Sequence, residues 1–169
     1  MKILSVVGNR PQFIKSGPVS VALRDAGIDE VVLHTGQHWD RTLSDVFFEE
    51  LGLAPPRYRL DLHTADPQAM RPGIRDAAAA ERPNAVLVYG DTNSTLAGAE
   101  AAGDSNVAVA HVEAGLRSGD LSMPEERNRI AVDAASALLL CPDERPPLYG
   151  DGHASERVAS ALLGTVAAA

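Results

Sequence analysis

A short stretch in the second half of the chain concentrates charged side chains that could carry acid–base chemistry. Residues 111–117 read His-Val-Glu-Ala-Gly-Leu-Arg, and residues 123–129 read Met-Pro-Glu-Glu-Arg-Asn-Arg. Carboxylates that lie close together can exchange protons with a substrate, and guanidinium groups beside them can bind an anion. The density of such groups favours a functional site over an ordinary solvated surface.

A strand and a helix are expected to hold these residues. The apolar run before His111 predicts a buried strand, and side chains alternate along a strand, so His111 and Glu113 should face the same way. Pro124 followed by two glutamates is typical of a helix start, because proline fits the first turn and acids suit its dipole. Glu125 and Arg129 should then share one face of that helix. The acids can therefore converge.

Apolar runs alternate with helical patterns along the rest of the chain. Near-continuous apolar runs, typical of strands buried on both faces, cover residues 2–7, 30–33, 85–89, 107–112 and 137–140. Helices are expected over residues 18–26, 43–51, 67–81, 94–102 and 124–136. This alternation predicts an α/β fold with a doubly wound parallel sheet.

Polar motifs follow four of the expected strands. They are Gly8-Asn9-Arg10, Thr35-Gly36-Gln37-His38, Gly90-Asp91-Thr92 and Glu113-Ala114-Gly115. Ligands of open α/β sheets bind beyond the carboxyl ends of the strands, so we expect one cleft there. Arg10, before a helix opened by Pro11, is well placed for an anionic ligand. The phosphate-binding turns G-x-G-x-x-G and G-x-x-x-x-G-K-[ST] are missing, which disfavours simple dehydrogenases and nucleoside triphosphatases.

Composition narrows the class of protein further. The 169 residues have the length of one domain, and their net charge of -8 argues against a nucleic-acid surface. No apolar stretch has the length of a membrane span, and the N-terminus lacks the apolar region of a signal peptide. The single cysteine, Cys141, cannot form an internal disulfide and is expected to be a small buried hydrophobe. A cytoplasmic location is therefore expected.

Five motifs, in order, resemble the non-hydrolysing UDP-N-acetylglucosamine 2-epimerases. They are GNRPQFIK at 8–15, TGQH at 35–38, YGDTNST at 89–95, HVEAGLR at 111–117 and PEERNR at 124–129. The resemblance covers residues 1–142 and implies the N-terminal Rossmann-like domain of a two-domain, glycosyltransferase-B-like architecture without its second domain. Residues 143–169 would form a divergent tail. Val158, Ala161 and Leu162 have helical spacing there and could cover the edge that the second domain leaves exposed.

The resemblance also implies a reaction and its residues. The reaction would invert the sugar carbon that bears the acetamido group, through elimination of UDP to a glycal and re-addition. The implied catalytic residues are Asp91, Glu113 and Glu125, and the implied substrate-binding residues are Arg10, Lys15, Gln37, His38 and Arg129. No cofactor and no metal are implied. A UDP-sugar is the expected partner, carrying either N-acetylglucosamine or a diacetamido-uronic acid, and a homodimer or a separately encoded second domain would complete the site.

Each of these residues also has a structural interpretation. Asp91 could cap a helix that begins near Thr92, and Glu125 could simply pair with the arginine one turn later. Glu113 could be half of an ion pair with Arg117 or Arg10. The expectation for His111 is satisfied packing in the strand, with orientation of the site second. Two further alternatives are open. A metal could be held by His111, Glu113 and Asp91, although they lack the usual ligand spacing, and Gln37 and His38 could order the cleft or the Gly36-Gln37 step could merely end a strand.

Three classes of function therefore stay open. The first is an epimerase of which this chain carries one half of the site. The second is a catalytically silent fragment or binding module that holds a nucleotide sugar weakly or contacts only a partner domain. The third is a sugar transferase of the same two-domain architecture, against which the specific carboxylate motifs count.

Overall fold

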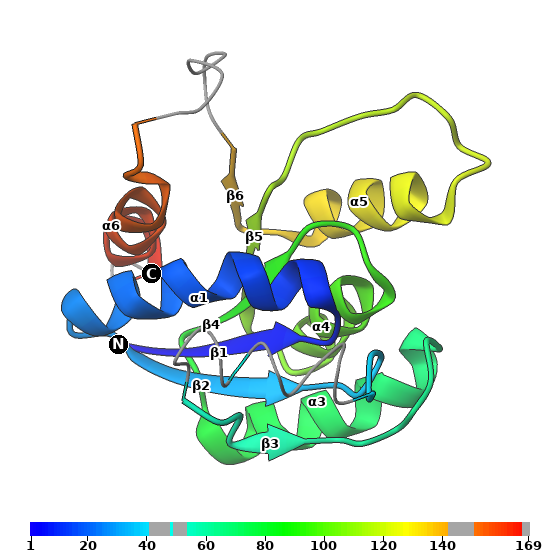
Figure 1. Cartoon of the computed structure of the whole chain (residues 1–169), viewed down its shortest axis with the longest axis horizontal. Coiled ribbons are helices and arrows are strands. Elements are labelled where there is room, and N and C mark those ends of the chain that lie inside the picture. Colours follow the sequence, from blue (N-terminus) through cyan, green and yellow to red (C-terminus); the bar gives the residue numbers. More distant parts are fainter. Residues whose placement is uncertain (41–47, 49–53, 142–150, 167–169) are drawn as a thin grey trace.

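The computed structural model describes residues 1–40, 48, 54–141 and 151–166, which form a six-stranded parallel sheet with helices on both faces (Figure 1). The strands lie in the order β3-β2-β1-β4-β5-β6. In chain order the elements are β1 (Lys2–Val7), α1 (Arg10–Asp25), β2 (Asp29–His34), β3 (Tyr58–Arg59), α3 (Pro67–Glu81), β4 (Ala85–Tyr89), α4 (Asn93–Asp104), β5 (Ala108–Val112), α5 (Pro124–Ala135), β6 (Leu138–Leu140) and α6 (Ala154–Val166). The predicted α/β class and the parallel sheet are confirmed.

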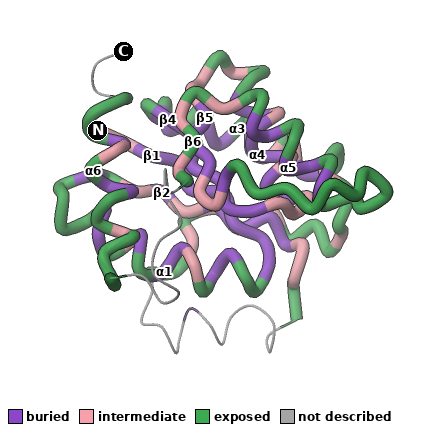
Figure 2. The backbone as a smooth tube through the Cα atoms, turned by 90° about the horizontal axis from the view of Figure 1, so that it is seen from above, coloured by how far each residue is buried: buried purple, intermediate pink, exposed green. Residues whose placement is uncertain are grey.

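Alternate residues of each central strand face different helical layers. In β1, Leu4 and Val6 pack with α3, α4 and α5, whereas Ile3 and Val7 pack with α1 and α6. Figure 2 shows the buried backbone concentrated in the strands between these two layers. A strand covered on both faces needs apolar side chains at successive positions, which explains the continuous apolar runs.

The strand order brings the site residues together. All five strand pairings are parallel, so the carboxyl ends of the strands lie at one edge of the sheet. The chain passes from β1 outward to β2 and β3, and later from β4 outward to β5 and β6. The direction of winding therefore reverses between β1 and β4, which is where an open α/β sheet leaves room for a ligand.

The first helix begins where Pro11 indicated a helix start, and not at residue 18, where the helical pattern was expected to begin. The helix expected over 18–26 is the second half of α1, which begins at Arg10 behind an Asn9 cap. Asn9 accepts a hydrogen bond from the Gln12 amide at 3.3 Å, and this cap is hidden in the sequence among polar residues. Pro18 lies inside the helix, where it removes the hydrogen bond to the carbonyl of Ile14. Both residues are exposed, so water can bind that carbonyl and the helix continues.

Three other expectations need correction or lie outside the described residues. Strand β3 was not predicted, because its two residues at the sheet edge form no apolar run. Cys141 is exposed and not buried, since it follows the last residue of the edge strand β6. Of the helix expected over 43–51, only Phe48 is described; it is helical and packs against Phe13 with ring centroids 5.2 Å apart.

The tail forms a helix, as its spacing predicted, but not in the place that was considered for it. Val158, Ala159 and Leu162 of α6 are buried in the layer that contains α1. Figure 1 shows α6 beside the later turns of α1, away from Arg10. Among the described residues, α6 therefore covers a face of the sheet and leaves its carboxyl edge open. No helix in the described ranges combines the length and apolar character needed to cross a bilayer.

Candidate functional site at the carboxyl edge of the sheet

Glu113 leaves the end of β5 in a left-handed backbone conformation. Its φ is 66°, which is uncommon for a residue with a side chain and is often found at functional sites. The Glu113 amide donates to the Leu140 carbonyl at 3.1 Å, which fixes the turn to β6. The carboxylate then forms an ion pair with Lys15 Nζ from α1. About a third of each side chain is exposed, 39% for Lys15 and 32% for Glu113, so solvent reaches the pair.

Asp91 follows β4 and is held by Arg129 of α5. Arg129 Nη2 lies 2.5 Å from Asp91 Oδ2, and Arg129 Nη1 donates to the Glu113 carbonyl. Only 8% of the Arg129 side chain is exposed. Asn128 adds a hydrogen bond to the Asp91 carbonyl at 3.1 Å. One guanidinium group therefore connects the two turns that carry Asp91 and Glu113.

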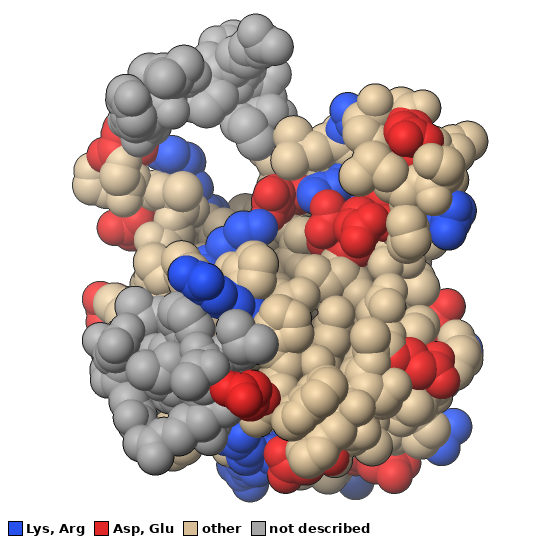
Figure 3. Space-filling model, turned by 45° about the vertical axis from the view of Figure 1, so that its right-hand side comes forward, with Lys and Arg blue, Asp and Glu red and all other residues tan. Residues whose placement is uncertain are grey.

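Gly90 lies where these groups approach one another. Its φ is 68°, which glycine adopts without strain. A Cβ at Gly90 would lie 3.5 Å from Glu113 Oε2 and 3.7 Å from Lys15 Nζ. The turn before Asp91 therefore borders the Lys15–Glu113 pair. Figure 3 shows acidic and basic side chains side by side in the hollow beneath the upper right-hand lobe of that view.

The loop after β2 completes the edge. Gln37 Oε1 accepts hydrogen bonds from the Ser94 amide at 3.1 Å and the Ser94 hydroxyl at 2.7 Å, which ties this loop to α4. The His38 amide donates to the Gly8 carbonyl at 2.7 Å, and His38 Nδ1 accepts from the Arg10 amide at 3.3 Å. Burial lowers the pKa of His38, which agrees with a ring nitrogen that accepts. Gln37 and His38 thus do more than end a strand.

The structure decides three of the alternative interpretations. Thr92, not Asp91, is the N-cap of α4, so Asp91 is not a helix cap. The ion-pair partner of Glu113 is Lys15 rather than Arg117 or Arg10, whereas Arg117 pairs with Asp133 at 2.7 Å.

Arg129 does not serve as the partner of Glu125. Arg129 reaches Asp91 and the Glu113 carbonyl. Glu125 stands exposed in the first turn of α5, one turn before Arg129 on the same helix. Within the described ranges, Glu125 lacks the anchoring contacts that hold Asp91 and Glu113.

Gln12 is a residue of this edge that sequence reasoning missed. Its side chain is 1% exposed and accepts from the Gly8 amide at 2.7 Å. Its amide nitrogen donates to the Tyr89 carbonyl at 3.0 Å and contacts the hydroxyls of Thr92 and Thr95. The end of β1 and the start of α4 are therefore joined through one side chain. Its position inside the GNRPQFIK motif was the available signal.

Two acids of α5 were also missed. Glu126 is 5% exposed and accepts from the Ser118 and Gly119 amides at 3.0 and 3.1 Å, which anchors the loop before α5. Asp133 contacts His111 Nδ1 at 2.7 Å. It lies four residues after Arg129 and hence on the same helix face, which was the signal for it. His111 is 0% exposed and both of its ring nitrogens have a hydrogen-bond partner, as satisfied packing requires.

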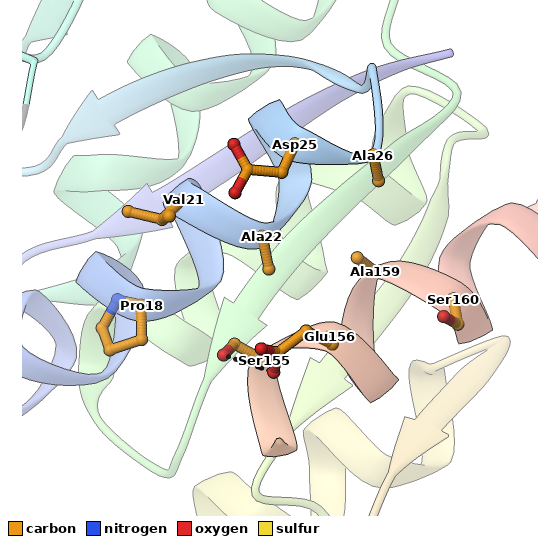
Figure 4. A pocket seen from close by; sticks show the side chains of 9 residues that line it. All are labelled: Pro18, Val21, Ala22, Asp25, Ala26, Ser155, Glu156, Ala159 and Ser160. Carbon is orange, nitrogen blue, oxygen red and sulfur yellow. Dashed lines mark hydrogen bonds between the residues drawn. The ribbon is translucent and has the colours of Figure 1, made fainter. Parts of the chain in front are cut away.

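The described residues offer no metal site here, and the cavity between α1 and α6 lies elsewhere. Across the described part of the chain, no group of three or more His, Cys, Asp or Glu side chains is arranged to hold a metal ion. A cavity of about 390 Å³ lies between α1 and α6, lined by Pro18, Val21, Ala22, Asp25, Ala26, Ser155, Glu156, Ala159 and Ser160 (Figure 4). None of the predicted site residues lines it. The polar cluster instead occupies the open edge of the sheet.

Comparison with known proteins agrees with this geometry. The family described as UDP-N-acetylglucosamine 2-epimerase matches residues 21–146. A UDP-2,3-diacetamido-2,3-dideoxy-D-glucuronate 2-epimerase from Pseudomonas aeruginosa is 50% identical over 147 residues, which are 84% of this chain and 42% of that protein. A UDP-N-acetylglucosamine 2-epimerase homolog from Methanococcus maripaludis is 47% identical and covers 85% of this chain and 41% of its own length.

Solved structures show the same relation. The crystal structure of the Methanocaldococcus jannaschii UDP-GlcNAc 2-epimerase in complex with UDP-GlcNAc and UDP superposes with a TM-score of 0.75 at 41% identity. It covers 80% of this chain, while the chain spans 39% of that protein. This chain thus spans about two-fifths of the length of the proteins it matches.

Proposed function

Because the chain belongs to the UDP-N-acetylglucosamine 2-epimerase family, we propose that it carries the carboxylate-bearing half of a UDP-sugar 2-epimerase site. The observation that carries the proposal is the pairing at the sheet edge, where Glu113 lies beside Lys15 and Asp91 beside Arg129. Two acids, each beside a cation and joined by one guanidinium group, suit a reaction that moves a proton while an anion departs. Residues 1–142 are the proposed domain.

The proposed reaction needs acid–base groups on both faces of a sugar ring. A carboxylate removes the proton from the carbon that bears the acetamido group, and the anomeric carbon–oxygen bond breaks with its electron pair leaving on UDP. The resulting glycal takes a proton on its opposite face while the UDP oxygen re-forms the bond. We assign the proton transfers to the set of Asp91, Glu113 and Glu125. Arg10, Lys15 and Arg129 would stabilise the negative charge that develops on the departing diphosphate.

The substrate class that we propose is a UDP-sugar with an acetamido group next to the anomeric carbon. The names of the relatives support two members of this class, UDP-N-acetylglucosamine and UDP-2,3-diacetamido-2,3-dideoxy-D-glucuronate. Gln37 and His38 would order the binding edge through Ser94 and Gly8. A cytoplasmic role in making precursors of cell-surface polysaccharides belongs to the same proposal.

Binding is the first test of this function. The chain, labelled with ¹⁵N, is titrated with UDP-N-acetylglucosamine and, separately, with the diacetamido-glucuronate nucleotide. We expect weak binding, with amide shifts at Gly90, Glu113 and Lys15, and weaker binding for Lys15→Met. Glu156→Gln, on α6 at the α1–α6 cavity, is the matched control and should bind as the wild type does. Shifts confined to that cavity, or none at either titration, would contradict the proposed site.

Turnover separates a half-site from a complete one. In deuterated water we expect the isolated chain to incorporate no deuterium at the acetamido-bearing carbon. A closed site lowers the barrier by holding the substrate in the reactive geometry, and a half-site holds it less well. Incorporation that Glu113→Gln abolishes would show that this domain suffices for catalysis. Transfer of the sugar to an acceptor without inversion would instead favour a transferase.

A further inference from the structure

His111 is enclosed in β5 with a partner at each ring nitrogen. None of its surface is exposed. Its Nδ1 lies 2.7 Å from Asp133 Oδ1, and its Nε2 lies 2.6 Å from the Gly90 carbonyl oxygen. The chemistry of these two partners determines which ring nitrogens carry protons.

The partners of His111 are the Gly90 carbonyl and the Asp133 carboxylate. The carbonyl of Gly90 can only accept, so Nε2 must carry a proton. Asp133 is surrounded by other donors, since its Oδ2 accepts from the Gly115 amide at 3.1 Å and lies 2.7 Å from Arg117 Nη1. Burial raises the pKa of Asp133, but hydrogen bonds, those from Arg117 and Gly115 foremost, outweigh it and hold that pKa below its usual value. An ionised carboxylate also only accepts, so Nδ1 carries a proton as well.

We propose that His111 is a buried imidazolium, paired with Asp133, that positions the two turns carrying Asp91 and Glu113. The protonation state is inferred from the partners of the two ring nitrogens and from the donors around Asp133. The consequence for substrate binding rests on the proposed function.

The hydrogen bonds show how one pair could position both turns. The Gly90 peptide is held from two sides, because its amide donates to the Val112 carbonyl at 2.9 Å and its carbonyl accepts from His111. Asp91 is the next residue. On the other side of the pair, Asp133 holds the Gly115 amide, two residues after Glu113. The segments before Asp91 and after Glu113 are therefore anchored to the same ion pair.

His34 provides an internal comparison. It is also 0% exposed, on β2, but its Nδ1 accepts a hydrogen bond from the Gly36 amide at 2.9 Å. A nitrogen that accepts cannot carry a proton, so His34 must be neutral. Two equally buried histidines in one sheet thus require opposite protonation states.

The test is a long-range proton–nitrogen correlation spectrum of the chain with ¹⁵N-labelled histidine at neutral pH. We expect both ring nitrogens of His111 to show the shifts of protonated nitrogen, whereas His34 should show one protonated and one unprotonated nitrogen. A neutral tautomer at His111 would overturn the proposal. This measurement needs no substitution and no ligand.

Asp133→Asn tests the pairing and the positioning. We expect His111 to lose one proton and to keep Nε2–H toward Gly90, with shifted amide resonances at Gly90 and Glu113. The resonances of Ala78 on α3 should stay in place. Asp76→Asn, an exposed carboxylate on α3, is the control and should leave His111 unchanged. A doubly protonated His111 in Asp133→Asn would contradict the pairing.

The effect on ligand binding is read separately. If the wild type binds UDP-N-acetylglucosamine, Asp133→Asn should lose the ligand-induced shift at Glu113. Retention of that shift would contradict the positioning role. Failure of the wild type to bind would overturn the proposed function, while the histidine spectra would still decide the protonation state.

Discussion

Arg129 Nη2 lies 2.5 Å from Asp91 Oδ2, so helix α5 holds the acid that follows strand β4. The other guanidinium nitrogen donates to the Glu113 carbonyl. Asp91 and Glu113 leave different strands, and this one side chain contacts the turns that carry both of them. The arginine is buried while Asp91 is only partly so, which places the pair at the border between core and solvent.

Arg129→Met should destabilise the fold and release Asp91. Loss of hydrogen bonds from a charged, buried donor costs roughly 2–3 kcal/mol. Urea unfolding measures the loss. Arg75→Met is the control, because Arg75 is exposed on α3 and surface substitutions usually change the free energy of unfolding by less than about 0.5 kcal/mol. Equal effects of the two substitutions would show that the Asp91 contact contributes nothing.

Gln12→Ala should lower the free energy of unfolding, because Gln12 hydrogen-bonds the end of β1, the end of β4 and the start of α4. It leaves the Gly8 amide and the Tyr89 carbonyl without this partner in a buried place, at a cost of roughly 1–3 kcal/mol. Gln68→Ala removes a glutamine of α3 that is exposed and donates to Glu100, and it should unfold almost like the wild type. The measurement is the midpoint of urea unfolding for the two variants, and equal midpoints would contradict the role of Gln12.

Glu126 should contribute stability that acid removes. The Ser118 amide chiefly lowers the pKa of Glu126 below 4.5, with help from the Gly119 amide and despite burial. A carboxyl whose pKa is lower in the folded state stabilises above the unfolded value and loses this contribution as the pH falls through the folded value. The difference in unfolding free energy between the wild type and Glu126→Gln should therefore shrink with falling pH below about 4.5. A constant difference would argue against the loop anchor.

Glu30 should show the opposite sign. Burial raises its pKa above 4.5, although hydrogen bonds from Ser5 and Ser20 oppose this. Its charged form is therefore disfavoured in the folded chain, and stability is lost as the pH rises above the unfolded value. Glu30→Gln should gain stability relative to the wild type as the pH rises, as followed by thermal unfolding across the acid range. A relative loss with rising pH would reverse the inferred cause.

The open carboxyl edge should promote self-association. Four large apolar side chains between residues 116 and 130 are exposed, namely Leu116, Leu121, Met123 and Ile130. Sedimentation at rising concentration should show dimers or larger species, and Leu116→Asp combined with Leu121→Asp should reduce them. Leu163→Asp, on α6, serves as the control. A chain that stays monomeric at every concentration would contradict the proposed homodimer and the exposed interface.

Much of the fold could be predicted because its signals are local. Apolar runs reported the buried strands, and the Pro67–Glu81 helix was predicted with the boundaries that the structure shows. The helical pattern alone placed the start of α1 at residue 18, whereas Pro11 indicated the start that the structure shows. Strand β3 was missed because two edge residues carry no periodic signal. Polar motifs at strand ends placed Arg10, Gln37, Asp91 and Glu113 at one edge, since parallel strands share the direction of their carboxyl ends.

The sequence by itself determined which residues reach the edge, but only the tertiary structure decided which of them pair. Lys15 and Glu113 are 98 positions apart, and Arg129 and Asp91 are 38 apart. Sequence reasoning offered Arg117 or Arg10 as a partner for Glu113 and a helix cap as the role of Asp91, and the structure shows neither. The strand order places α1 and α5 against the ends of β4 and β5, and a charge pairs with the opposite charge that lies within a few ångströms in space. Distance along the chain carries no information about that choice.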